Sequence, residues 1–214
     1  MPAGPEKHSK VEPIRHRVLL RYAGLLPKAL EKYPVYVIKK YLKAIHFAGN
    51  INQDGFEYGG SYDPFRHILF IVDSGWEKDK RSYYTIHHEL SSLFLARHSF
   101  FINPWTDHNP KNFKYSYEVT DDALKTYNSA SSVGTNSDFE KGFMNTYGQT
   151  NFENDFNEYS AMILTYPKKF KEIMDKYPRV RGKFLVWLDF YQKIDPIFTE
   201  AYLFGVKKDL MIAN

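Results

Sequence analysis

The chain has 214 residues, 43% of them hydrophobic and 17% aromatic, which is enough to bury one sizeable core. Its 29 basic and 25 acidic residues are scattered along the whole length, and this dispersed net charge of +4 argues against a nucleic-acid interface. The absence of cysteine excludes disulfides, thiolate ligands and cysteine nucleophiles, and no run approaches the roughly 18 to 20 apolar residues of a bilayer-spanning helix.

Compartment is left open by the first residues. The segment 1–10 is polar and lacks the apolar centre of a signal peptide, while its Met-Pro-Ala-Gly-Pro start resembles a loose leader. Removal of an export signal ahead of it would be compatible with a periplasmic or extracellular protein. We therefore assign no localisation.

The first half of the chain predicts helices followed by strands. Apolar residues recur at helical spacing over 12–32 and end at Pro34, and a second, short helix is expected over 35–41. Three strands are expected over 44–51, 56–63 and 67–72, the second of them broken by glycine. A longer helix is expected to begin at Arg81 or Ser82 and to run to His98.

The second half predicts a loop-rich region and then helices. Residues 99–148 are rich in Pro, Asn, Ser and Gly, with one helix expected at 120–127. Helices are expected over 151–164, 168–176 and 179–193, closed by Pro167, Pro178 and Pro196. We expect an α+β fold in a single domain, 1–214, with a helical part (1–42), strands and motif helix (43–98), a loop-rich cleft region (99–150) and C-terminal helices (151–214).

One short motif carries the chemistry. His88 and Glu89 open the pattern H-E-x-x-H, in which two histidines one helical turn apart bind zinc and the glutamate polarises a metal-bound water. Ser92 stands where the second histidine belongs, and a serine hydroxyl is a poor zinc ligand. His87 points about 100 degrees away from His88 on a helix and is expected to pack or hydrogen-bond.

Four segments together resemble a known family. They are the strand segment Tyr58-Gly59-Gly60-Ser61-Tyr62-Asp63, the motif His87-His88-Glu89, the segment from Tyr147 to Glu158, and the helical tail from Phe170 to Pro196. In this order they resemble the gluzincin branch of the zincins, in particular the zinc-binding metallopeptidase family and, more distantly, anthrax lethal factor-like domains. The resemblance implies a zincin-like fold in which 56–63, including Tyr58 to Asp63, is the edge strand and the following turn that border the cleft.

The resemblance also implies roles for individual residues. His88 would be the first zinc ligand, Glu89 the general base, and Tyr147 the donor to the oxyanion of the tetrahedral intermediate. The third ligand stays ambiguous: Asn154 occupies one aligned position and would be a weak donor, whereas Asp155 or Glu158 fits the other. Asp155 and Glu158 are three residues apart on one helix, so both are expected to point at the same site. His98, His67 and His108 are further histidines without support as ligands.

Two functions follow from this pattern. The first is a zinc-dependent metallopeptidase or hydrolase with an atypical Zn²⁺ site that cleaves a peptide or protein substrate. The second is a catalytically inactive zincin-fold module that binds a peptide or protein partner, with Ser92 and Asn154 making ordinary hydrogen bonds. No nucleic-acid partner and no membrane span are expected for either.

Overall fold

The computed structural model describes residues 10–53, 56–73, 79–117 and 133–205, and within them the fold is α+β, as the sequence predicts. The first half contains β1 (Lys10–Pro13), α1 (His16–Leu30), α2 (Val35–Tyr41), β2 (Ala44–Gln53), β3 (Phe56–Glu57), β4 (Gly60–Asp63), β5 (Ile68–Val72) and α3 (Asp79–Arg97). The second half contains α4 (Asn103–Thr106), α6 (Asn136–Lys141), the 3-10 helix η1 (Tyr147–Gln149), α7 (Phe152–Thr165), α8 (Pro167–Lys176), α9 (Pro178–Ile194) and α10 (Glu200–Phe204). The helix expected at 120–127 lies outside the described residues.

The strands form one mixed sheet. Its order is β1-β2-β5-β4, and β3 pairs with the C-terminal end of β2 at Asn52 and Gln53. β2 runs parallel to β5, while β1 and β4 are antiparallel to their neighbours. Among the described strands, β4 is therefore an edge strand, in agreement with the position expected for residues 58–63.

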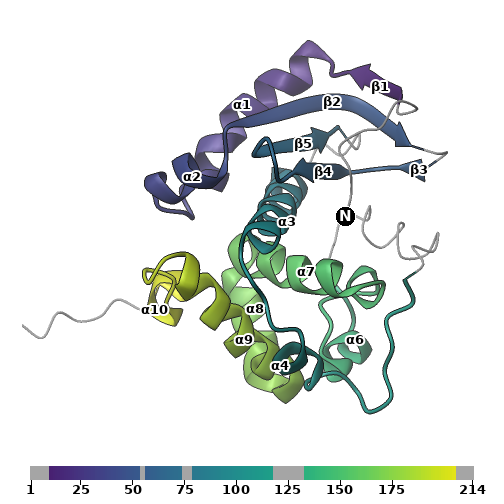
Figure 1. The fold of residues 1–214 in the computed structure, drawn as a ribbon, viewed down its shortest axis with the longest axis vertical. Helices are drawn as coiled ribbons and strands as arrows, with labels where there is room; N and C mark the ends of the chain where they lie inside the picture. Colours follow the sequence, from purple (N-terminus) through teal and green to yellow (C-terminus); the bar gives the residue numbers. More distant parts are fainter. Residues whose placement is uncertain (1–9, 54–55, 74–78, 118–132, 206–214) are drawn as a thin grey trace, which may run out of the picture.

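Helix α3 lies at the centre of the molecule. Figure 1 shows the sheet on one side of α3 and helices α7 to α9 on the other. Side chains of α3 are buried almost all around the axis from Arg81 to Phe94, which is the burial pattern of a helix enclosed by protein. Polar residues on such a helix must find partners inside the protein, because water is not available to them.

The structure corrects three details of the predicted elements. The first helix begins at His16 instead of residue 12, because Lys10–Pro13 extends and pairs with β2. The strand expected over 56–63 is two strands, since β3 pairs with β2 while β4 pairs with β5. Pro167 and Pro178 each occupy the first turn of the following helix. A backbone N–H in that turn has no partner within the helix, so proline is tolerated there, and each proline begins one helix as well as ending the one before.

Helices α7 and α9 are joined by an ion pair inside the core. Lys183 Nζ lies 2.6 Å from Asp155 Oδ2, and both side chains are fully buried. Trp105 Nε1 and the Tyr115 hydroxyl also donate to Asp155 Oδ2, each at 2.8 Å. The Lys183 ammonium lies 3.9 Å from the ring centre of Phe143, so the charge is enclosed by aromatic rings as well as paired.

In the part of the chain that the structure describes, no helix is long and apolar enough to cross a membrane.

We expect Lys183→Met to destabilise the protein by about 3–5 kcal/mol, because it leaves the Asp155 carboxylate buried without its counter-charge. Urea unfolding followed by circular dichroism measures the change. Lys193→Met is the matched control: Lys193 lies on the same helix and pairs with Asp189 at 2.6 Å, but both side chains are more than half exposed. The control should cost no more than about 1 kcal/mol. Equal effects of the two substitutions would contradict the structural role of the buried pair.

Candidate functional site

The candidate site is built on α3 and α7, which pack side by side (Figure 1). His88 and Glu89 of α3 are both almost fully buried. His88 Nδ1 lies 3.0 Å from Glu158 Oε1 of α7. Two of the residues predicted as site residues are thus brought together directly.

Glu158 receives hydrogen bonds from three sides. Besides its contact with His88, its Oε2 accepts from the Tyr84 hydroxyl and from the Asn145 amide. Tyr84 lies one helical turn before His88, at the spacing that places two α3 side chains on one face. That spacing was a usable signal for Tyr84, whereas nothing in the sequence indicated Asn145.

Opposing effects set the protonation of His88. Burial lowers the pKa of its imidazole, but the hydrogen bond to Glu158 and the charges of Glu89, Glu158 and Glu153 outweigh burial and raise the pKa above the ordinary value. His87, by contrast, is hydrogen-bonded to the Tyr33 hydroxyl at 2.9 Å, and burial lowers its pKa to about 3. The prediction that His87 is a hydrogen-bonding core residue is confirmed.

Glu89 lies between α3 and the edge strand. A Cβ atom added at Gly60 of β4 would come within 2.6 Å of Glu89 Oε1, so the carboxylate lies directly against the backbone of the strand. Burial raises the pKa of Glu89 to about 7; the charge of His88 lowers it, and those of Glu153 and Glu158 add to the rise. A carboxylate that exchanges its proton near neutral pH has the property required of a general base or acid.

Tyr147 and Tyr62 bring phenol groups to the site. Tyr147 belongs to η1, is partly exposed, and its ring centre lies 5.9 Å from that of His88. Tyr62 of β4 is buried, and burial together with the Glu153 charge raises the pKa of its hydroxyl. The sequence interpretation assigned no role to Tyr62 or Glu153, although both lie in segments that carried the family resemblance.

The two altered ligand positions hold hydrogen-bonded neutral side chains. Ser92 Oγ accepts a 2.6 Å hydrogen bond from the amide of Asn157. The amide of Asn154 donates to Thr150 Oγ1 at 2.8 Å. Both residues therefore serve the packing of the helices that carry them.

Asp155 is part of a different cluster from Glu158. Its carboxylate is bound by Lys183, Trp105 and Tyr115, as described above. Although Asp155 and Glu158 are three positions apart on α7, Glu158 contacts His88 of α3 while Asp155 contacts Lys183 of α9. The expectation that both carboxylates point at one site does not fit these contacts. Helix α7 packs between α3 and α9, and the two carboxylates bind partners on these two different helices.

The other histidines make contacts elsewhere. His98 Nε2 lies 2.7 Å from the Tyr41 hydroxyl, and His67 Nδ1 lies 3.2 Å from the Tyr41 carbonyl oxygen. His108 packs against Gly182 of α9. Within the described ranges, no group of three or more His, Asp or Glu side chains is arranged to hold a metal ion. The donor set thus does not fit a tetrahedral zinc site with three protein ligands.

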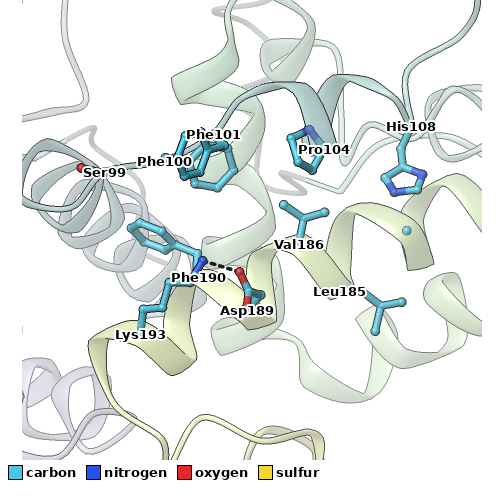
Figure 2. Close-up of a pocket in the computed structure, with 11 residues that line it drawn as sticks. Ser99, Phe100, Phe101, Pro104, His108, Leu185, Val186, Asp189, Phe190 and Lys193 are labelled. Carbon is cyan, nitrogen blue, oxygen red and sulfur yellow. Dashed lines mark hydrogen bonds and ion pairs between the residues drawn. The ribbon is translucent and has the colours of Figure 1, made fainter.

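A cavity lies away from these residues, between the segment after α3 and helix α9. Its volume is about 360 Å³, and Figure 2 shows that apolar side chains form most of its wall. The Asp189–Lys193 ion pair lies at its side. The main apolar contributors are Phe100, Phe101, Pro104, Leu185, Val186 and Phe190.

In comparisons with known proteins, no protein-family model, no curated protein and no solved structure matches the chain.

The raised pKa of Glu89 predicts a pH dependence of stability. A buried acid whose pKa is higher in the folded than in the unfolded state stabilises the fold below its unfolded pKa of about 4.5, and that contribution is lost as pH rises through about 7. Relative to Glu89→Gln, the wild-type protein should therefore lose roughly 3 kcal/mol of stability between pH 4.5 and pH 8. Urea unfolding of both proteins across this range measures the difference. The exposed Glu140→Gln variant should follow the wild type, and parallel curves for wild type and Glu89→Gln would contradict the prediction.

Proposed function

We propose that this chain is a zincin-like module that binds an extended peptide along β4 and does not use zinc. The observation that carries the proposal is the edge of β4, which pairs only with β5 among the described strands and lies beside His88 and Glu89. The supporting observation is that Ser92 and Asn154, where zincins place metal ligands, are occupied by hydrogen bonds within the protein. The zincin-like fold itself is part of the proposal.

The register of β4 indicates which backbone groups would bind the peptide. The amide of Val72 donates to the carbonyl of Gly59, which makes Gly59 and Val72 a hydrogen-bonded antiparallel pair. Pairing then alternates along the strand, so the N–H and C=O groups of Gly60 and Tyr62 point away from β5. A peptide added as a further strand would pair with these groups, as in other cases of strand addition to a sheet edge.

A zinc-dependent hydrolase is the second candidate, and one contact favours it. A carboxylate bonded to one ring nitrogen of histidine is the usual arrangement that orients the other nitrogen toward a metal, and Glu158 has this relation to His88 Nδ1. In that case Glu89 would act as general base and Tyr147 as oxyanion donor. Zinc would supply Lewis acidity, and the incomplete donor set makes this the weaker candidate.

Metal content separates the two candidates. For protein purified without chelators and then dialysed with zinc, we expect elemental analysis to find well under one zinc per chain, since one histidine and scattered carboxylates give too few strong ligands. The His88→Ala variant should give the same value. One zinc per chain that disappears in His88→Ala would overturn the metal-free proposal and favour the hydrolase, for which Glu89→Gln should then abolish peptide cleavage.

Peptide binding is tested with a blocked heptapeptide, acetyl-Thr-Val-Thr-norleucine-Thr-Val-Thr-amide. In an NMR titration with EDTA present, we expect the amide signals of Gly60 and Tyr62 to shift. Two further peptides are N-methylated on alternate residues, one on each set. Only one set of peptide N–H groups faces β4, so one methylated peptide should lose binding and the other retain it. Shifts confined to residues remote from β4, or equal binding of both methylated peptides, would argue against strand addition.

A further inference from the structure

One buried carboxylate in the site has no hydrogen-bond donor among the residues that the structure describes. Glu89 is 6% exposed, and no hydrogen bond from a described residue reaches its carboxylate. The buried carboxylates of α7 differ: Glu158 receives three donors, and Asp155 receives three donors on Oδ2, although its Oδ1 has none among the described residues. A buried carboxylate without a donor is costly, so Glu89 marks a place where a partner is missing.

The missing partner lies on the side of the edge strand. Glu89 Oε1 touches the position where a Cβ of Gly60 would be, so only glycine leaves the carboxylate room there. Tyr62 is two residues further along β4, on the same face of the strand, and burial together with the nearby Glu153 charge raises the pKa of its hydroxyl. Two carboxylates, Glu89 and Glu153, thus lie below the strand edge where the proposed peptide would bind.

The charges around Glu89 favour a cation. Helix α7 contributes Glu153 and Glu158, and β4 contributes the neutral Tyr62. Helix α3 contributes His88, whose Nδ1 is bonded to Glu158, and Arg81. These are the charged groups that act on Glu89 in the described part of the chain, and three carboxylates outnumber the two basic groups.

We infer that the residue of the bound peptide that faces Gly60 is a lysine or arginine, whose cationic group donates hydrogen bonds to Glu89 and Glu153. This inference rests on the proposed peptide binding along β4 and names the side chain that is selected. An ammonium or guanidinium group supplies both the N–H donor that Glu89 lacks and the positive charge that the cluster lacks. A neutral aliphatic side chain of the same length supplies neither.

The test compares three peptides on the intact protein. They are the norleucine heptapeptide described above and the same peptide with lysine or arginine in the central position. We expect isothermal titration calorimetry to show at least about tenfold tighter binding for one or both cationic peptides, since a charge-assisted hydrogen bond to a buried carboxylate has at least this effect. The lysine and arginine arms identify which cation fits.

Substitution of Glu89 assigns the preference to this residue. Glu89→Gln keeps the size of the side chain and removes its charge, so the ratio of the affinity for a cationic peptide to that for the norleucine peptide, both measured on this variant, should fall below about threefold. The matched control Glu140→Gln removes an exposed glutamate on α6, and it should leave all affinities unchanged.

The outcomes separate the two proposals. If the norleucine peptide binds and the cationic peptides bind equally well, the inference about the side chain is overturned while peptide binding stands. A cationic preference that persists in Glu89→Gln likewise overturns the assignment to Glu89. If none of the three peptides binds, peptide binding along β4 fails, and the inference fails with it.

Discussion

The polar interface between α3 and α7 is the constraint on which the rest of the structure depends. Two helices that pack in the core usually meet through apolar side chains, yet here His88 meets Glu158, Ser92 meets Asn157, and Ser91 meets Ser160 at 2.7 Å. Each buried polar group left without a partner would cost about 1–3 kcal/mol. The pairs therefore fix the rotation and register of one helix against the other, and so place Glu89 under β4.

The buried carboxylates of this core divide into two kinds. Asp155 has a lysine, an indole and a phenol as donors, and its place between α7 and α9 is explained by the packing of those helices. Glu89 has no such set, and burial with neighbouring like charges holds its pKa near 7. Asp155 has a counter-charge inside the fold, although its Oδ1 has no donor among the described residues, whereas Glu89 lies beside a strand edge without a donor from the described residues and is therefore a candidate for binding. This contrast, more than the short motif, directs attention to Glu89.

The edge strand β4 lies beside the helix that carries His88 and Glu89. β4 ends the described sheet, and the backbone groups of Gly60 and Tyr62 face its open side. Glu89 and Glu153 lie beneath the same strand. In the proposed function, strand addition would supply affinity from the backbone, and the carboxylates below the edge would supply selection by charge. The apolar cavity beside α9 is lined differently and lies on the far part of the helical region, so it adds nothing to this argument.

Local patterns in the sequence determined much of this architecture. Helical periodicity and prolines located α1, α7, α8 and α9 to within a few residues, and apolar runs located β2 and β5, because these signals act between residues close in the chain. The motif placed His88, Glu89 and Ser92 on one helix for the same reason. The contact of His88 with Glu158 also agrees with the sequence interpretation, which drew on a resemblance.

Only the tertiary structure decided what surrounds each polar side chain. Helical spacing alone places Asp155 and Glu158 near one another on α7 and does not say what each contacts. Because α7 is buried between α3 and α9, Asp155 pairs with Lys183 of α9 and Glu158 pairs with His88 of α3. Asn145, Glu153 and Gly60 join the site from segments distant in sequence. Lys10–Pro13 is a strand because its backbone pairs with β2, which is distant in sequence. Burial and long-range pairing set these outcomes, and neither is encoded in the spacing of nearby residues.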